Sequence, residues 1–455
     1  MDFSSFFRPE TVAVIGVSYS SDQHPANVIF SKNLLRYPAR IFPVNPKGGE
    51  LLGQEVFSSI SKIPEAIDLA VIAVRADLVP LIISECIKAG VKGAIVISGG
   101  FAEVGRHDLQ DALIKAASKD NFPVIGPNCL GSFCPGFIDT FFLPSERVVQ
   151  PPSGNVAIIS QSGGILVDLL VKFADEGIGI SSAISIGNKA LIREIQLLEH
   201  FSHDPETDVI AFYIEGFKEN EGRHFVKKAA LCPKPVVVIK SGKTEQGSRA
   251  VSSHTASLAG DYKVFEGVCK QHGIFVAQDE FELVNYCEAL SCYSESSGRK
   301  IGVVSASGGH GALSVDACTH HGLEVPVLSE TLQKELKEVL SENVKSIASI
   351  GNPIDLTGSA KEYDFVQTVE ILSGSDEIDC ILLLILPYVP GISSDLGARV
   401  SLIYRKFGKP LVAYVPHVDK YRMLIEGFEL NKVPVSSSIE GAVLMAKAIG
   451  TKRNA

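Results

Sequence analysis

The chain lacks the long apolar runs, paired cysteines and basic clusters that mark membrane, secreted and nucleic-acid-binding proteins. Its longest apolar stretch, Ile381–Leu386, is too short to cross a bilayer and is followed by proline. None of the nine cysteines forms a CxxC pair, and their odd number argues against a disulfide framework. A net charge of -10 without basic clusters argues against a nucleic-acid partner. Because the first residues, MDFSSFFRPE, also lack the features of a signal peptide, we expect a cytoplasmic protein without a membrane or nucleic-acid partner.

What the chain does have is apolar residues spread over a long sequence. Its 455 residues suggest roughly three domains of about 150 residues each. The hydrophobic fraction of 45% against 21% charged residues is ample for large cores. A mean hydropathy of +0.21 fits buried parallel strands, which are continuous apolar runs.

Short apolar runs alternate with helical segments along the whole chain, which predicts an α/β protein with parallel, doubly wound sheets. A proline-rich joint over residues 144–152 and a polar stretch over residues 294–300 divide the runs into three sets. The expected domains span residues 1–145, 146–293 and 299–455. The expected strands are 11–17, 41–44, 69–74, 94–97 and 124–125, then 156–160, 180–186, 209–214, 236–239 and 274–277, then 301–305, 381–385 and 411–415, with 324–327 and 433–435 as edge strands.

Two nearly identical turns open the second and third domains, ISQSGG at residues 159–164 and VSASGG at residues 304–309. Glycine pairs turn the backbone tightly, and a helix N-terminus with serine hydroxyls suits an anion such as phosphate. One such turn is most simply an ordinary strand–helix junction with an N-cap, but two matching copies favour a function. Together they are predicted to hold a phosphoryl group without lysine or arginine. The candidate phosphate-binding residues are Ser160, Ser162, Gly163, Gly164, Ser307, Gly308 and Gly309.

His254 lies in a stretch of small and polar residues, 242–260, which we expect to form a mobile loop able to surround an oxyanion. A histidine nucleophile needs a partner that fixes its tautomer. Glu215 is the best candidate because it ends an apolar strand, where doubly wound domains place their chemistry. It is also consistent with a simple helix cap. The composition indicates phosphoryl chemistry through phosphohistidine.

The first domain begins with a strand and a Gly-x-Ser turn at Gly16 and Ser18, which is not a full GxGxxG dinucleotide motif. Lys47 stands near the end of the second strand, where a dinucleotide site for NAD would have an acidic residue. It suits a ribose phosphate, and equally an exposed turn. The segments ISGG (97–100), IGPN (125–128) and GNPIDLT (351–357) demand unusual backbone geometry, as ligand-binding loops and plain turns both do.

His200 and His203 have only a loose metal-ligand spacing and no further ligand motif joins them. A solvated helix end explains the pair better, so we predict no metal site.

Taken together and in order, these motifs resemble the nucleoside-diphosphate-forming acyl-CoA synthetase superfamily, which includes succinyl-CoA synthetase. The resemblance covers essentially the whole chain and is strongest to the α subunits of ADP-forming acetyl-CoA synthetases. It rests on IGVS, PVNPK, SGG and IGPNCLG, then ISQSGG, IEG (214–216), SSHTASLAG, SASGGHG and GNPIDLTG.

The resemblance implies a Rossmann-like CoA-binding domain followed by two flavodoxin-like ligase domains. His254 would be the phosphorylated histidine, oriented by Glu215 and held by the helices that begin at Ser162 and Ser307. The residues expected to line the site for coenzyme A or acetyl-CoA are Gly16, Ser18, Lys47, Val74, Ser98, Gly99, Gly100 and Asn128.

The remaining sequence has neither a P-loop nor room for the ATP-grasp unit that such synthetases use for nucleotide and Mg²⁺. The resemblance therefore implies an ATP-grasp β subunit that binds Mg-ADP or Mg-ATP, in an α₂β₂ heterotetramer. The expected reaction is acetyl-CoA + ADP + phosphate = acetate + ATP + CoA. The alternatives are an NAD(P)-dependent oxidoreductase, which leaves the Ser-Gly-Gly turns and His254 unused, and a non-catalytic CoA-binding regulatory protein, which would not need His254 and Glu215.

Overall fold

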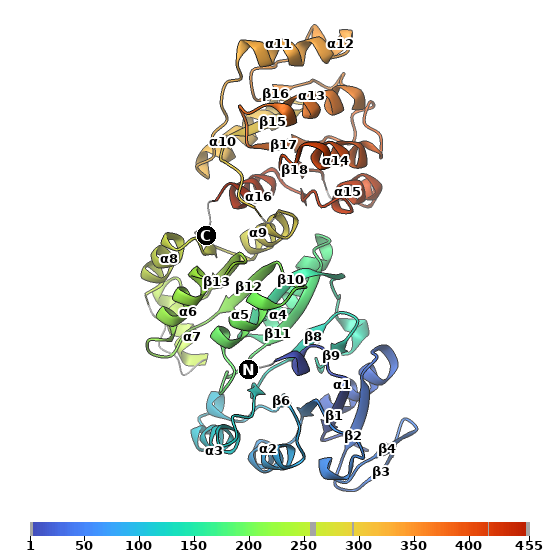
Figure 1. The fold of residues 1–455 in the computed structure, drawn as a ribbon, viewed down its shortest axis with the longest axis vertical. Helices are drawn as coiled ribbons and strands as arrows, with labels where there is room; N and C mark the ends of the chain where they lie inside the picture. Colours follow the sequence, from blue (N-terminus) through green and yellow to red (C-terminus); the bar gives the residue numbers. More distant parts are fainter. Residues whose placement is uncertain (1–2, 255–260, 294, 417, 452–455) are drawn as a thin grey trace. The chain divides into compact units, whose positions relative to one another are not determined.

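The computed structural model describes residues 3–254, 261–293, 295–416 and 418–451. The chain forms two compact units, unit 1 (Met1–Val276) and unit 2 (Ala277–Ala455). Unit 1 is built around two sheets and unit 2 around one, and the main strands of all three are parallel. The predicted α/β class is therefore confirmed (Figure 1).

The first sheet of unit 1 is parallel and has the order β2-β1-β5-β6-β7. Its strands are largely apolar. Alternate residues of β1 pack in two cores: Val12 and Val14 in one, and Ala13 and Ile15 in the other. Its strands and helices are β1 (Thr11–Ile15), β2 (Arg40–Val44), β5 (Leu69–Ile72), β6 (Gly93–Val96), β7 (Val124–Ile125), α1 (Pro25–Arg36), α2 (Val79–Lys88) and α3 (His107–Ser118), with a separate hairpin of β3 (Gly49–Leu51) and β4 (Gln54–Val56).

The second sheet has the order β14-β13-β12-β10-β11-β8-β9. Its last two strands are antiparallel additions from residues 131–139, a segment that the sequence assigned to the first domain without predicting strands in it. The elements are β8 (Gly131–Cys134), β9 (Ile138–Asp139), β10 (Ser153–Ser160), β11 (Ile180–Ser185), β12 (Val209–Ile214), β13 (Val236–Lys240), β14 (Phe275–Ala277), α4 (Gly163–Asp175), α5 (Glu194–His203), α6 (Glu221–Ala230), α7 (Glu245–His254) and α8 (Tyr262–Gln271).

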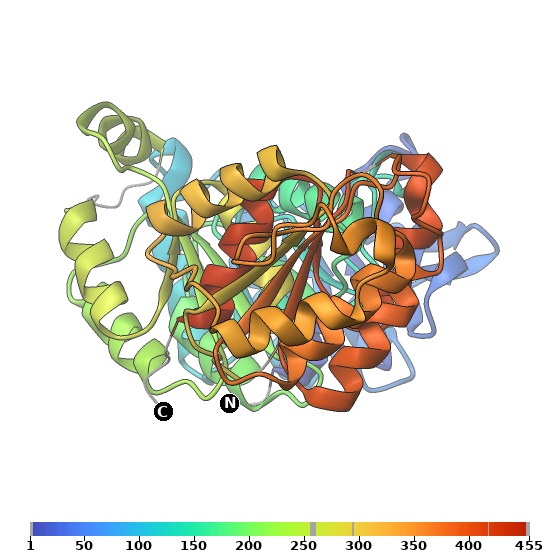
Figure 2. The same cartoon turned by 90° about the horizontal axis from the view of Figure 1, so that it is seen from above.

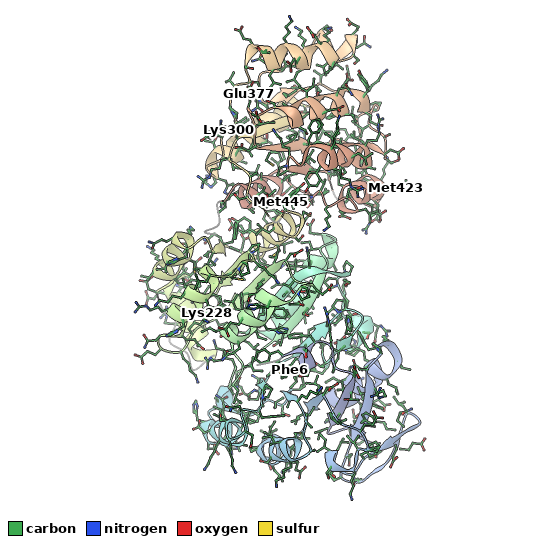
Figure 3. The ribbon with its side chains drawn as sticks, in the orientation of Figure 1. Phe6, Lys228, Lys300, Glu377, Met423 and Met445 are labelled. Atoms are coloured by element: carbon green, nitrogen blue, oxygen red, sulfur yellow. The ribbon has the colours of Figure 1, made fainter. Side chains whose placement is uncertain are left out.

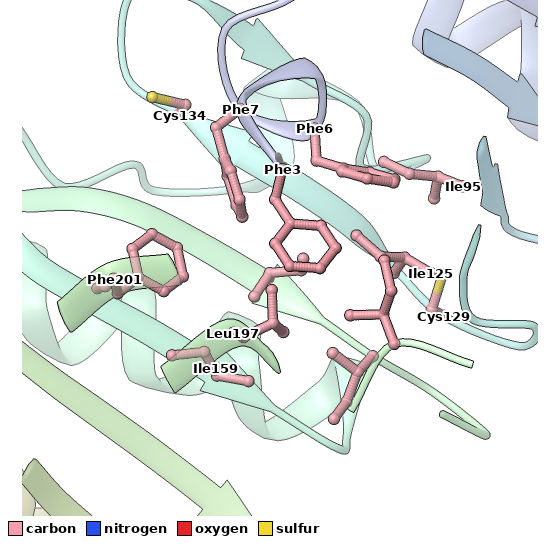
Figure 4. Close-up of a cluster of buried hydrophobic side chains, with 14 of the residues drawn as sticks. Phe3, Phe6, Phe7, Ile95, Ile125, Cys129, Cys134, Ile159, Leu197 and Phe201 are labelled. Atoms are coloured by element: carbon pink, nitrogen blue, oxygen red, sulfur yellow. The ribbon is translucent and has the colours of Figure 1, made fainter. Parts of the chain in front are cut away.

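An aromatic segment at the start of the chain joins the two sheets of unit 1. Figure 4 shows Phe3, Phe6 and Phe7 between Ile95 of the first sheet and Phe201 of α5. The ring of His200 stacks on Phe7 with centroids 5.2 Å apart. The expectation of a solvated helix end is therefore wrong for His200, which packs into this aromatic core.

Unit 2 has a parallel sheet of order β16-β15-β17-β18-β19, with helices on both faces (Figures 1 and 2). Its last helix, α16, is nearly all apolar and its Met445 is fully buried, whereas Met423 on α15 is exposed (Figure 3). The elements are β15 (Ile301–Ser305), β16 (Ile354–Asp355), β17 (Cys380–Leu384), β18 (Leu411–Tyr414), β19 (Val435–Ser436), α9 (Glu280–Cys292), α10 (Gly308–His320), α11 (Glu330–Val339), α12 (Glu342–Lys345), α13 (Glu362–Gly374), α14 (Leu396–Phe407), α15 (Arg422–Glu429) and α16 (Ile439–Gly450).

One expectation about unit 2 needs correction. The edge strand predicted at residues 324–327 is reduced to a single bridge between Lys300 and Glu324, and β16 in the GNPIDLT segment takes the edge instead.

Helix α9 lies within the expected second domain, residues 146–293. It packs on α16 and belongs to unit 2. The two compact units divide at residues 276–277.

Numbered along the chain, the parallel strands of each sheet follow the order 2-1-3-4-5, which is the flavodoxin-like doubly wound order. Ligands of such sheets bind where the order reverses, beside the carboxyl ends of the first and third strands. In the second sheet these are the ends of β10 and β12. In the first sheet they are the ends of β1 and β5.

The described part of the chain contains no helix that combines the length and apolarity needed to cross a membrane. All nine cysteines carry free thiols, and most are buried. Burial raises the pKa of Cys86 and of Cys129 to about 12, which keeps both thiols protonated.

Candidate functional site

The two Ser-x-Ser-Gly-Gly turns adopt the same local structure. In unit 1 the Ser162 N–H donates to Ser160 Oγ at 3.1 Å, and the Ser160 hydroxyl donates to Ser162 O at 2.6 Å. In unit 2 the Ser307 N–H and the Ser305 hydroxyl form the same pair of bonds, both at 3.1 Å. The repeat noted in the sequence is thus a repeated turn in which the first serine braces the second.

Each turn ends in a helix whose second residue is an uncrowded glycine. Outside the helix's own backbone, the nearest described atom to a Cβ built on Gly164 is Ser162 Oγ, at 4.0 Å. At Gly309 it is Ser307 Oγ, at 3.9 Å. The start of α4 therefore leaves room for an anion beside its first N–H groups. At the start of α10, Asp355 Oδ2 lies 3.1 Å from a Cβ built on Gly308.

The side chain of Gln161 holds the segment that follows β12. Its Oε1 accepts from the N–H groups of Glu215, at 2.8 Å, and Gly216, at 3.2 Å. Its Nε2 donates to Gly216 O at 3.0 Å and to the carboxylate of Glu194. These bonds fix the segment after β10 to the segment after β12 at the switch point. Glu215 is buried there, with 8% of its surface exposed.

A buried ion pair between Lys189 and Glu194 completes this arrangement. We call Gln161, Lys189 and Glu194, which surround Gly216, the clamp. Lys189 Nζ donates to Glu194 Oε1 at 2.6 Å and to Gly216 O at 2.5 Å. Burial lowers the pKa of Lys189, which Glu194 offsets in part. Glu194 is fully buried, and its Oε2 has no hydrogen-bond partner among the described residues.

Replacing Lys189 by methionine is expected to lower the free energy of unfolding by about 3 kcal/mol, because it leaves the Glu194 carboxylate buried without its counter-ion. Lys228→Met is the control: Lys228, labelled in Figure 3, forms an ion pair with Glu199 in which both side chains are about half exposed, and its loss should cost less than about 1 kcal/mol. Urea denaturation of the two variants measures the difference. Equal losses would mean that the clamp does not stabilise this unit.

The turn, the clamp and the loops of the first sheet line one cavity of about 1730 Å³ within unit 1. Asn188 ties the two sides together, since it donates to Glu103 Oε2 at 2.6 Å and accepts from Asn128 Nδ2 at 3.2 Å. The predicted residues that line the cavity are Ser162, Gly163, Gly164, Glu215 and Asn128.

The other residues predicted for the first domain lie at the carboxyl edge of its sheet. The Val74 N–H donates to Ser98 Oγ at 3.0 Å, the Ser98 hydroxyl donates to Val74 O at 2.5 Å, and the Asn128 N–H donates to Ser98 O at 2.9 Å. Lys47 follows β2 and is exposed. Gly99 and Gly100 follow Ser98 after β6, and the Gly100 N–H donates to Glu103.

Gly16 ends β1 with a positive φ of +107° and lies against the next strand. A Cβ on Gly16 would come within 2.4 Å of Ala73 O. The Ser18 N–H, two residues later, donates to Asn27 Oδ1 at 2.6 Å, which anchors the turn to α1. The glycine is thus required for β1 and β5 to approach each other at the switch point.

Gly16→Ala is expected to destabilise unit 1 by about 2 kcal/mol or more, since it adds both backbone strain and a clash. Gly53→Ala is a matched control, because Gly53 has a φ of +74° with no atom within 4 Å of the added Cβ, so only the strain of about 1 kcal/mol remains. The difference between their unfolding free energies measures the clash. If both variants lose the same amount, the close approach at Gly16 is unimportant.

The sequence predicts a loop over residues 242–260. This prediction is wrong for residues 245–254, which form α7. The helix begins after Thr244, whose Oγ1 accepts from the Gly247 N–H at 3.0 Å, and Glu245 follows in its first turn. His254 is the last residue of α7. Its side chain and residues 255–260 lie outside what the structure describes.

Sequence reasoning missed the residues of the clamp. Gln161 lies inside the ISQSGG motif, but only its neighbours were singled out. Lys189 and Glu194 are charged residues in segments without any motif. No local signal marks Lys189 as a partner of Gly216, or Glu194 as a partner of Lys189 and Gln161. Lys240, which also lines the cavity, was missed as well. One feature of the sequence could have indicated it: a lysine at the end of the apolar run VVVIK.

The fold and site define a CoA-binding protein of the succinyl-CoA ligase type. Residues 10–135 match the family model of a CoA binding domain, and residues 153–290 match that of a succinyl-CoA ligase like flavodoxin domain. The chain is 34% identical to the ADP-forming acetate–CoA ligase II subunit alpha of Pyrococcus furiosus, over 98% of both chains. It belongs to the family of ADP-forming acetate–CoA ligase α subunits.

A solved structure supports the same relationship. The dinucleotide forming acetyl-coenzyme A synthetase 1 of Ca. Korarchaeum cryptofilum, in complex with phosphate and ADP, is 31% identical with a TM-score of 0.89. The match covers 98% of this chain and 96% of that one.

Some relatives are much longer than this chain. It is 36% identical over 84% of its length to an ADP-forming acetate–CoA ligase I of Archaeoglobus fulgidus, and 37% over 77% to one of Methanocaldococcus jannaschii. These matches span only 54% and 49% of those proteins, about half of their length.

Proposed function

We propose that this chain is the α subunit of an ADP-forming acyl-CoA synthetase with the reaction acetyl-CoA + ADP + phosphate = acetate + ATP + CoA. One observation carries the proposal: three features line the same cavity. They are the helix start at Ser162–Gly164, the residue Glu215 after β12, and Asn128 in a loop of the first sheet. An anion held at the helix start is thereby next to a carboxylate and next to the edge of the sheet expected to hold CoA.

In the first step, phosphate held at the helix start attacks the thioester carbonyl of acetyl-CoA. A phosphate oxygen bonds to the carbonyl carbon, the carbon–sulfur bond breaks, and CoA leaves as its thiolate. The N–H groups and hydroxyls of the turn hold the phosphate oxygens and so position the attacking one beside the carbonyl carbon. The product that remains is acetyl phosphate.

In the second step, an imidazole nitrogen of His254 attacks phosphorus and the bond from phosphorus to the acetate oxygen breaks. Glu215 compensates the positive charge on the ring, and acetate leaves. The phosphoryl group then passes from His254 to ADP. Catalysis of this kind relies on positioning and electrostatics. We assign Ser307, Gly308 and Gly309 of the second turn to phosphoryl binding, because this turn has the same internal hydrogen bonds as the first.

The site for CoA is assigned to the carboxyl edge of the first sheet. Gly16 and Ser18 would let the backbone approach the pyrophosphate, and Lys47 would meet a ribose phosphate. Val74, Ser98–Gly100 and Asn128 form the adjoining edge, from which the thiol end of CoA can enter the cavity.

The nucleotide is assigned to a partner. The described residues fold into three doubly wound sheets and a small hairpin, and this part of the chain includes no ATP-grasp unit. The name of the Pyrococcus furiosus relative, subunit alpha, supports a separate β subunit. We propose that this β subunit is an ATP-grasp protein that binds Mg-ADP. We propose an α₂β₂ assembly.

Purification of the native complex followed by an assay of ATP formation tests the proposal. We expect an ATP-grasp protein to copurify, and ATP to form only when acetyl-CoA, ADP and phosphate are all present. CoA should bind to the chain and NAD should not. Binding of NAD in place of CoA would indicate an oxidoreductase, and CoA binding without ATP formation by the complex would indicate a regulatory protein; either result contradicts the proposal.

A further inference from the structure

Lys240 is a buried lysine at the candidate site to which none of the steps above gives a role. It is the last residue of β13 and pairs in register with Ile214 of β12, one residue before Glu215. The residue is only 2% exposed, yet it lines the cavity together with Ser162 and Glu215. Figure 1 shows β13 beside β12 in the second sheet.

The ammonium group of Lys240 has no counter-ion among the described residues. Its Nζ donates to the backbone oxygens of Glu215, at 3.4 Å, and Ser241, at 3.0 Å. The other deeply buried lysines do have one: Lys32 is 2.9 Å from Asp139, and Lys189 is 2.6 Å from Glu194. Burying a charge without its partner is costly, so an uncompensated lysine facing a cavity indicates a ligand of opposite charge.

The repeat in unit 2 supplies an internal comparison. In the second sheet, Ser160 pairs with Tyr213 and Tyr213 with Ile239, directly before Lys240. In unit 2, Ser305 pairs with Leu384 and Leu384 with Tyr414, directly before Val415. Val415 is fully buried. The position that Lys240 takes in the second sheet is thus taken by an apolar valine in the sheet of unit 2. This kind of sheet therefore does not need a lysine there.

A second cation adjoins this one. Burial, and secondarily the charge of Lys189, lower the pKa of Lys240. Lys189 is already neutralised by Glu194, whereas Lys240, which lines the cavity, has no such partner among the described residues. A bound anion would relieve both the desolvation and the repulsion.

We propose that Lys240 is the cationic ligand of the phosphoryl group that occupies this cavity. The proposal rests on the proposed function and adds to it, because the turn at Ser162–Gly164 offers only hydroxyls and backbone N–H groups. Lys240 supplies the full positive charge that these lack. The proposal adds Lys240 to a site that the sequence predicted to hold the group with helix ends alone.

Lys240→Met in the full chain, assembled with its partner, tests this role. We expect both the Kd for inorganic phosphate, measured by calorimetry, and the KM for phosphate to rise about 10- to 100-fold, because a charge-assisted contact is lost. The KM for acetyl-CoA should stay within twofold. Lys240→Arg, which keeps the charge, should recover a large part of the phosphate affinity.

Lys234→Met is the matched control. Lys234 precedes the same strand at its opposite end, and its Nζ also donates to two backbone oxygens, of Phe201 at 2.7 Å and Asp204 at 2.5 Å. Its removal should affect stability in a similar way but leave the phosphate constants within twofold. Thermal denaturation of each variant shows that the folded protein is being compared.

Unchanged phosphate constants in folded Lys240→Met, or equal losses in Lys234→Met, would overturn the inference. A wild-type complex that labels a histidine with phosphate while Lys240→Met keeps its phosphate affinity would refute only the role of Lys240. A wild-type complex that never becomes phosphorylated would refute the proposed function itself.

Discussion

Replacing His254 by alanine is expected to abolish phosphorylation of this chain. With the partner subunit and ATP labelled in its γ-phosphate, the wild-type chain should acquire acid-labile, base-stable label, which is the behaviour of phosphohistidine. The alanine variant should acquire none, because His254 is the residue that we assign to accept the phosphoryl group between the acyl phosphate and ADP. Net ATP formation should fall with it, since the covalent intermediate connects the two half-reactions.

His224→Ala is the control for this experiment. His224 lies on α6 in the same unit, is exposed, and does not line the cavity. Its variant should label as the wild type does. Label that persists in His254→Ala, or that disappears equally in His224→Ala, would contradict the assignment of His254.

The strands and turns of the fold could be predicted from the sequence because their signals are local. Apolar runs such as Leu69–Ile72 and Val209–Ile214 are buried on both faces, so each forms a continuous hydrophobic segment. The Ser-x-Ser-Gly-Gly turns are equally local, since each serine braces its own turn. The predicted site residues in these segments therefore fall on strand ends.

Two elements escaped prediction for different reasons. Strand β16 has only two residues, Ile354 and Asp355, and becomes a strand through its pairing with β15. Helix α7 contains Gly247 and three serines, a composition typical of loops. The local signal for the helix is its cap at Thr244, to which the prediction gave less weight than to the composition.

The clamp around Gly216 shows the same limit within the site. Lys189 is 27 residues from Gly216, and Gln161 is 55 residues away. Nothing near either residue in the sequence indicates a shared acceptor. Only the parallel sheet, which brings the ends of β10, β11 and β12 to one edge, makes these three segments neighbours.

Glu215→Gln is expected to slow phosphorylation of the chain on the order of 100-fold while leaving CoA binding unchanged. A neutral amide cannot compensate the positive charge that develops on a histidine ring during phosphoryl transfer. The backbone N–H of residue 215 donates to Gln161 Oε1, a contact that the substitution keeps. The rate is measured by rapid-quench labelling at saturating nucleotide, and CoA binding by calorimetry.

Glu199→Gln is the matched control, because it makes the same neutralisation at a carboxylate on α5 that is about half exposed. That variant should keep the wild-type phosphorylation rate. Equal rates in Glu215→Gln and the wild type would refute an electrostatic role for Glu215, whereas a parallel loss of CoA affinity would mean that Glu215 serves the CoA site. A slower phosphorylation rate with unchanged CoA affinity would show that the Glu215 carboxylate acts in phosphoryl transfer. The role of the clamp would then be to let Gln161 and Lys189 fix the backbone that carries this carboxylate.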